Sequence, residues 1–108
     1  MLRITQGKGF QITFENGYTL SVQFGPMNYC ENKNYNWSEP YARAASEAGE
    51  RGSSNAEIAV IAPNKELLQI EPHDSVRGWV SPDEIARIMG IVATNPLSLV
   101  VRKSNEED

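Results

Sequence analysis

Alternating apolar and polar residues over 10–24 predict a β-hairpin. A period of two is typical of strands that bury one face and expose the other. Asn16-Gly17 lies between the two halves, and this pair favours a type I′ turn, whose twist matches that of the flanking strands. The hairpin is expected to set its own register and to organise the sheet. Its apolar positions are Phe10, Ile12, Phe14, Tyr18, Leu20, Val22 and Phe24.

Four further segments are expected to complete an antiparallel sheet. Residues 2–6 read as a first short strand, and the almost wholly apolar run 56–62 reads as a central strand covered on both faces. A Pro-Asn turn then leads into 66–71, which predicts a second hairpin. Residues 76–80 read as a further short strand, in which Trp79 is expected to pack under the helix that follows. After that helix, residues 97–101 are expected to form either a last strand or a docked segment.

A C-terminal helix has the clearest boundary signal in the chain. Residues 81–84, Ser-Pro-Asp-Glu, provide an N-cap, a proline at the first helical position and a glutamate at the third, the pattern of a capping box. Ile85, Ile88, Met89 and Val92 then form one apolar stripe. The expected fold is therefore α+β, an antiparallel sheet of about five or six strands with one amphipathic helix packed on a face.

Residues 25–55 form an insertion of roughly thirty residues without a strand pattern, and insertions this long are usually functional or disordered. Segment 42–48 has good helix propensity but is too short to be stable alone, so it is either a docked helix or a mobile loop. We expect one domain over 1–103, and we expect the acidic tail 104–108 to fray.

The part of the insertion over 28–41 interleaves asparagines with aromatic rings, and two interpretations stay open. Rings in a polar loop offer stacking faces to a ligand or a protein. Alternatively, the rings form a lid over the sheet while the asparagines make turns. If this region binds, the candidate binding residues are Asn28, Tyr29, Asn32, Asn34, Tyr35, Trp37, Tyr41, Arg43 and Arg51.

Composition narrows the class of protein. The chain has 108 residues and a formal net charge of −4, and this acidic balance argues against general nucleic-acid binding, which depends on clustered Lys and Arg. No run of about 18 apolar residues predicts a membrane span, and no signal-peptide pattern occurs at the start. The single cysteine excludes an internal disulfide and fits a reducing, cytoplasmic compartment.

The residues give no catalytic signature, so no enzyme, metal site or cofactor is expected. Cys30 would need a nearby base to act as a nucleophile, and the only histidine, His73, lies 43 positions away. We interpret Cys30 as a small buried side chain. His73 with Glu71 and Asp74 lies in a turn, where neighbouring side chains rarely converge on one metal ion.

The segment 7–30, G-K-G-F-Q-I-T-F-E-N-G-Y-T-L-S-V-Q-F-G-P-M-N-Y-C, resembles a family of small uncharacterised proteins from tailed bacteriophages and prophages. The resemblance is sharpest over 7–32 and extends more weakly to the strand at 56–61 and the start of the C-terminal helix. The family tends to have glycine where this chain has Met27. The resemblance implies a protein made in the cytoplasm of an infected or lysogenic bacterium, and it implies no activity.

These observations support three hypotheses. The first is a phage accessory binding protein that counters host defence by binding a host protein or by sequestering a nucleotide signal. The second is a virion or assembly component, for which an oligomeric, particle-associated protein would be evidence. The third is a small hydrolase, which would need a nucleophile and a base that the sequence does not offer.

Overall fold

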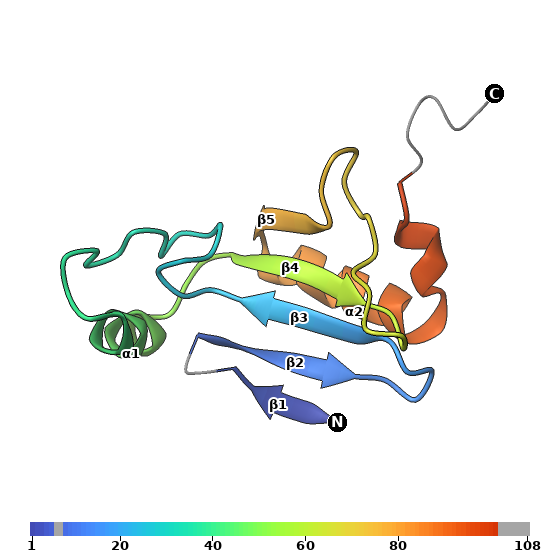
Figure 1. Cartoon of the computed structure of the whole chain (residues 1–108), viewed down its shortest axis with the longest axis horizontal. Coiled ribbons are helices and arrows are strands. Elements are labelled where there is room, and N and C mark those ends of the chain that lie inside the picture. The colour runs from blue at the N-terminus through green and yellow to red at the C-terminus, as the bar shows by residue number, and fades with distance from the viewer. Residues whose placement is uncertain (6–7, 102–108) are drawn as a thin grey trace.

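The protein is an α+β fold built on one five-stranded antiparallel sheet (Figure 1). The computed structural model describes residues 1–5 and 8–101, so Gln6 and the tail 104–108 lie outside the described residues. Strand order follows chain order throughout, because each strand pairs with the one that precedes it. The strands are β1 (Leu2–Ile4), β2 (Gly9–Thr13), β3 (Thr19–Gln23), β4 (Ala56–Ile61) and β5 (Val76–Val80).

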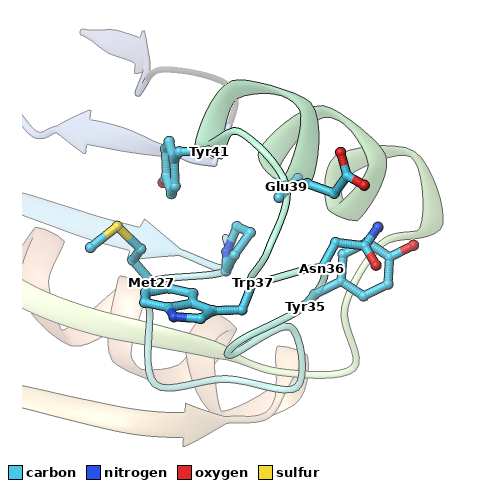
Figure 2. Close-up of a pocket in the computed structure, with 8 residues that line it drawn as sticks. Met27, Tyr35, Asn36, Trp37, Glu39 and Tyr41 are labelled. Atoms are coloured by element: carbon cyan, nitrogen blue, oxygen red, sulfur yellow. The ribbon is translucent and has the colours of Figure 1, made fainter.

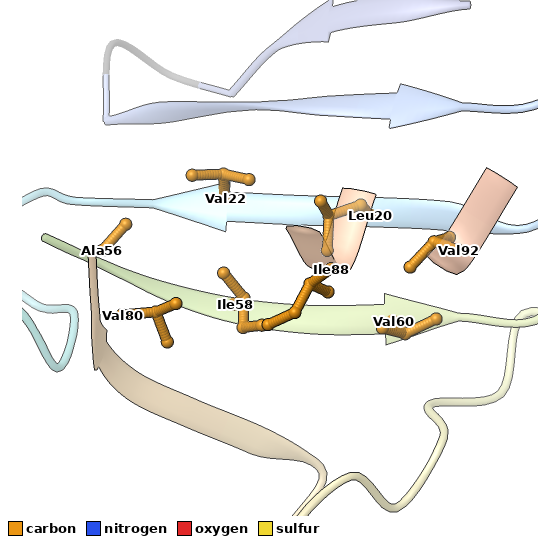
Figure 3. Close-up of a cluster of buried hydrophobic side chains, with 8 residues drawn as sticks. All are labelled: Leu20, Val22, Ala56, Ile58, Val60, Val80, Ile88 and Val92. Carbon is orange, nitrogen blue, oxygen red and sulfur yellow. The ribbon is translucent and has the colours of Figure 1, made fainter. Parts of the chain in front are cut away.

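The core lies between the sheet and helix α2 (Pro82–Thr94), as the apolar stripe predicts (Figure 3). Ile88 and Val92 are fully buried against β3 and β4, and Ile85 and Met89 pack beside them. Ser81 caps the helix through its Oγ, which accepts a hydrogen bond from the Glu84 amide at 3.2 Å. The buried cluster consists of Leu20, Val22, Ala56, Ile58, Val60, Val80, Ile88 and Val92.

The capping box predicts a hydrogen bond from the Ser81 backbone amide to the Glu84 side chain, and this part of the prediction is wrong. The Glu84 carboxylate does not return to the backbone of Ser81 but accepts hydrogen bonds from Arg87 at 2.6 Å and from Arg77 at 3.2 Å. Charge-assisted bonds to guanidinium groups are stronger than a bond to a neutral amide. Glu84 therefore joins α2 to β5 instead of completing its own helix end.

The hairpin exists, but the predicted type I′ turn is wrong. Thr13 pairs with Thr19, and the Phe14 amide donates to the Tyr18 carbonyl, which leaves three residues in the loop. Only Gly17 has a positive φ, 88°, and Asn16 does not. This is the three-residue loop that ends in a left-handed glycine bulge. The Asn16 amide group is then free to donate to the Val92 carbonyl of α2 at 2.9 Å.

The second predicted hairpin is reduced to an isolated bridge. Ile61 pairs with Leu67, and residues 66–71 form no strand, so β4 takes β5 as its second neighbour. The expected C-terminal strand or docked segment at 97–101 is a short 3₁₀ helix, η1 (Pro96–Leu99). It is followed by a hydrogen bond from the Val101 amide to the Gln69 carbonyl.

The expected cover on both faces of β4 is also wrong. Ala56, Ile58 and Val60 are buried under α2, whereas the alternate residues Glu57 and Ala59 are only half-buried on the other face. Since α2 packs on one side of the sheet (Figure 1), the other side presents the polar positions of the strands. In the described part of the chain, α2 does not cover that polar face.

The insertion contains a docked helix, α1 (Tyr41–Arg51), which resolves the choice between helix and mobile loop. Ala44, Ala45 and Ala48 are buried on one side of α1. The segment 25–39 precedes α1 as a chain of turns at one end of the sheet (Figure 1). This end of the molecule contains the candidate site.

Candidate functional site

Two asparagines predicted to bind a ligand instead point inward and order the 25–39 segment. Asn28 is buried, and its Oδ1 accepts from the Gly25 amide at 2.9 Å. Asn32 is fully buried, and its Nδ2 donates to the carbonyls of Phe24 at 2.8 Å and Gly52 at 3.2 Å. Buried amides need such partners. The local backbone hydrogen bond expected of these asparagines is therefore confirmed for Asn28, whereas Asn32 bonds to carbonyls 8 and 20 positions away.

Acidic and amide side chains fasten the same segment to the start of β4. The Glu57 carboxylate accepts from the Tyr29 amide at 2.8 Å, and the Glu31 carboxylate accepts from the Ser54 amide at 2.8 Å. Asn55 Oδ1 accepts from the Glu31 amide at 2.6 Å. These bonds connect residues more than 20 positions apart in sequence, so they hold the segment in one position relative to the sheet.

Trp79 does not pack under α2, and this prediction is wrong. Its ring is 57% exposed and lies against Tyr29, with ring centroids 5.7 Å apart. A bulge in β5 turns it outward: Ala56 pairs with Val80 but Ile58 pairs with Arg77, and Trp79 has a left-handed φ of 51°. Left-handed conformations are rare and strained for bulky residues.

Close contact with Tyr29 holds the strained Trp79 conformation. The Trp79 amide donates to the Tyr29 carbonyl at 2.8 Å. Gly78 lets the two segments approach, because a Cβ at Gly78 would lie 2.6 Å from the Tyr29 Cβ. The fold therefore presents the Tyr29 and Trp79 rings together at the surface instead of burying either one.

A small apolar pocket lies between the 25–39 segment and α1 (Figure 2). Its volume is about 130 Å³, roughly the size of one aliphatic side chain and below the 300 Å³ or more usual for small-molecule sites. Met27 lies beside the Trp37 indole, with Tyr41 across from them (Figure 2). Trp37 is 62% exposed and Met27 60% exposed.

The Trp37 ring is thus not a lid over the sheet. Asn34 and Asn36, which flank Tyr35, have left-handed φ values of 66° and 49°. Asparagine tolerates this conformation better than most residues. The two turns direct the backbone so that Trp37 lies at the pocket rim, where most of its ring is in solvent.

The predicted basic residues already have partners within the protein. The Arg43 guanidinium pairs with the Glu39 carboxylate at 3.2 Å, and Arg51 stacks over the Tyr35 ring at 4.6 Å from its centroid. Glu39 also lines the pocket. An arriving phosphate would compete with the Glu39 carboxylate for Arg43, so these arginines do not form a ready anion site.

Cys30 is buried, and its thiol donates weakly to the Gly25 carbonyl at 3.6 Å. Burial raises the pKa of this thiol. A raised pKa lowers the fraction of thiolate, the reactive form. Over residues 1–5 and 8–101 no group of three or more His, Cys, Asp and Glu side chains is placed to hold a metal ion. No helix in the same part of the chain is long and apolar enough to cross a membrane.

The residues that form the candidate site are only partly the ones that the sequence predicted. We define the aromatic surface as Met27, Tyr29, Trp37 and Trp79. Of the predicted residues it keeps Tyr29 and Trp37, and it adds Met27 and Trp79. Gly78, next to Trp79 in a short strand, is the sequence signal of a bulge that could have indicated an outward-turned ring. Comparison with known proteins matches the chain to no family model, no curated protein and no solved structure.

Proposed function

We propose that this chain is a non-enzymatic binding protein that docks a partner protein on the aromatic surface. The observation that carries the proposal is that Met27, Tyr29, Trp37 and Trp79 are exposed although hydrogen bonds hold the 25–39 segment against the sheet and the Trp79 amide against Tyr29. Tyrosine, tryptophan and methionine are enriched in protein interfaces. Ordered rings also lose little conformational freedom on binding.

The geometry favours a protein partner over a nucleotide at this surface. The pocket of about 130 Å³ accepts one side chain but not a base with its sugar. Arg43 is already paired with Glu39 at the pocket rim, and Arg51 is already stacked on Tyr35. A protein segment that inserts one apolar side chain beside Trp37 and covers Trp79 would satisfy the site without new phosphate contacts.

The bacteriophage resemblance suggests the setting. We propose an accessory protein that acts in the cytoplasm of the bacterial host, where its partner is a host protein and its binding counters a host defence. Support comes from the residues of 7–32 that carry the resemblance and from the exposed aromatic surface, to which that region contributes Met27 and Tyr29.

Burial of the Trp37 ring supplies enough free energy to dominate such an interface. An exposed fraction of 62% of a side chain with about 250 Å² of surface leaves roughly 150 Å², which at about 25 cal/mol/Å² is worth about 4 kcal/mol before association costs. Interface tryptophans that become fully covered typically cost 2 kcal/mol or more when truncated.

The test uses the parent chain, Trp37→Ala, Trp79→Ala and Leu97→Ala as baits in a bacterial host lysate. Leu97 is a matched control because it is also 62% exposed, but it lies on η1, outside the aromatic surface. We expect a host protein that the parent and Leu97→Ala retain and the tryptophan variants lose. Its purified form should bind Trp37→Ala at least about 30-fold more weakly than the parent.

Amide spectra of each variant establish that it is folded before binding is compared. Retention of the same proteins by all four baits, or an unchanged Kd for folded Trp37→Ala and Trp79→Ala, would remove the aromatic surface from any binding role. Loss of binding by Leu97→Ala alone would move the interface to the other end of the molecule.

A further inference from the structure

The open face of the sheet contains a second concave site, remote from the pocket at Trp37. A groove of about 610 Å³ lies over β1 to β4 on the side that α2 does not cover. Register places its residues in rows across the strands: Arg3 pairs with Gln11, Gln11 with Ser21, and Gln23 with Glu57. Residues opposite each other on paired strands share a face.

The floor of this groove is polar and yet buried. Ser21 and Gln23 are both buried. The Gln23 amide is fully used within the protein: its Oε1 accepts from Thr5 Oγ1 at 2.8 Å, and its Nε2 donates to Ser21 Oγ at 3.1 Å and to the Phe10 carbonyl at 3.3 Å. These bonds fix the floor in one arrangement, which removes an ordering cost from binding.

The groups left over after this internal bonding are mainly hydrogen-bond donors. Among the hydrogen bonds and ion pairs of residues 1–5 and 8–101, Lys8 and Gln11 have no side-chain partner, and the Arg3 guanidinium contacts only the Met1 sulfur at 3.9 Å. Ser21 Oγ accepts from Gln23 but its own proton has no acceptor there. Unused donors around one cavity call for an acceptor-rich ligand.

Charge is separated along the groove. Arg3 and Lys8 line it near β1 and β2, whereas Glu57 lines it from β4. Strands are spaced about 4.8 Å apart, so Arg3 on β1 and Glu57 on β4 have backbones roughly 14 Å apart. The positive end is therefore far enough from the carboxylate to hold an anion, although the whole chain has a net charge of −4.

We propose that this groove binds a small phosphate ester of nucleotide size. Its phosphate is held by Arg3 and Lys8, because a guanidinium and an ammonium together match a dianion and its several acceptor oxygens. The Gln11 amide and the Ser21 hydroxyl donate to the polar remainder, and Glu57 accepts N–H groups from its far end. A volume of about 610 Å³ lies within the roughly 300 to 1,000 Å³ usual for small-ligand sites.

The proposal is independent of protein docking at the aromatic surface. It assigns the phosphate to Arg3 and Lys8 instead of the predicted Arg43 and Arg51. Trp37→Ala should therefore leave ligand binding in the groove unchanged while it removes protein binding. Failure of one proposal leaves the other standing.

The experiment is an amide-spectrum titration of the whole chain in low salt with the four ribonucleoside 5′-monophosphates, the matching nucleosides, inorganic phosphate and citrate. We expect at least one nucleotide to shift the amides of Gln11, Ser21 and Gln23. The matching nucleoside, phosphate and citrate should each bind at least about fivefold more weakly, since each lacks part of the contact set.

Arg3→Ala and Lys8→Ala should each weaken nucleotide binding by about tenfold, the change expected for one lost charge-assisted hydrogen bond. Arg43→Ala, which removes an exposed arginine outside the groove, is the matched control and should change the Kd less than twofold. Because Arg3 is exposed, its substitution should leave the fold intact, as the amide spectrum will report.

Each of the following outcomes would overturn the proposal. The first is that no nucleotide shifts any amide, or that the shifts are confined to residues outside the groove. The second is that the nucleoside or citrate binds as tightly as the nucleotide. The third is that Arg3→Ala and Arg43→Ala weaken nucleotide binding equally. Inorganic phosphate binding as tightly as the best nucleotide would reduce the groove to a simple anion site and would also refute it.

Discussion

The Asn16 side chain offers the sharpest test of how the hairpin is joined to the helix. Its Oδ1 accepts from the Tyr18 amide at 3.0 Å, and its Nδ2 donates to the Val92 carbonyl at 2.9 Å. Val92 lies in the last turn of α2, where backbone carbonyls have no partner within the helix. Asn16→Asp keeps the first bond and removes the second.

The expected loss of stability follows from two changes. One hydrogen bond of about 1 kcal/mol disappears, and the new carboxylate faces the negative end of the α2 dipole, which costs about 0.3 to 1 kcal/mol more. We therefore expect Asn16→Asp to lower the free energy of unfolding by about 1.5 to 2 kcal/mol. For a chain of this size the melting temperature should fall by roughly 8 °C.

Asn64→Asp is the matched control. Asn64 is exposed like Asn16, and its Oδ1 accepts from the Glu66 amide at 3.0 Å in the same type of turn, but no bond from its amide group is present in the described part of the chain. The two variants add the same charge. Urea unfolding at pH 7 should therefore show a loss for Asn16→Asp and little change for Asn64→Asp.

The pH dependence of the Asn16→Asp variant gives an internal check. A carboxylate facing a carbonyl has its pKa raised in the folded state, and its protonated form can donate to Val92 again. The loss of stability should therefore be complete above the raised pKa of the folded state, and it should fade as the pH falls toward the unfolded pKa of about 3.9, below which it is absent. Equal losses in Asn16→Asp and Asn64→Asp, or a loss that does not change with pH, would refute the role assigned to Asn16.

Three further predictions concern other parts of the structure. The hydrogen bond from Arg87 lowers the pKa of Glu84 to about 2. The ionised Glu84 therefore stabilises the fold fully above about pH 4.5, and this contribution is lost as the pH falls toward 2. Glu84→Gln should flatten the dependence of stability on pH in that window, and an unchanged slope would contradict the pairing. Ile88→Ala should cost about 2 to 5 kcal/mol in urea unfolding, against less than about 0.5 for exposed Leu97→Ala, and equal costs would mean that α2 faces the other way. The buried thiol of Cys30, whose pKa burial raises, should react with iodoacetamide at pH 7 far more slowly in the native protein than in urea; equal rates would show an accessible thiolate.

The sequence by itself determined the elements whose signals are local. Alternation over 10–24 predicted the first hairpin, and the stripe through Ile88 and Val92 predicted which side of α2 is buried, since period alone states which residues share a face. Ser81 predicted the helix start because an N-cap acts within three residues. The α+β class follows from these elements and their order.

The site depended on contacts between distant segments. Whether Trp79 faced the helix or solvent was decided by a bulge opposite Glu57 and by the approach of Tyr29, and neither is visible in the alternation of β5. Likewise, Arg51 lies over Tyr35 because α1 folds back on the segment before it, whereas Arg43 pairs with Glu39, which is only four positions away.

The groove could not be predicted from the sequence, because it depends on how the elements pack. The alternation of each strand predicts a polar side, but only the packing of α2 on the opposite face leaves Arg3 and Gln11 together on a side that no helix of the described residues covers. Periodicity fixes which side chains point the same way, whereas the cover that a face receives depends on how many elements the chain has and where they dock. With one helix behind β3 and β4, the chain buries one face and leaves the other open.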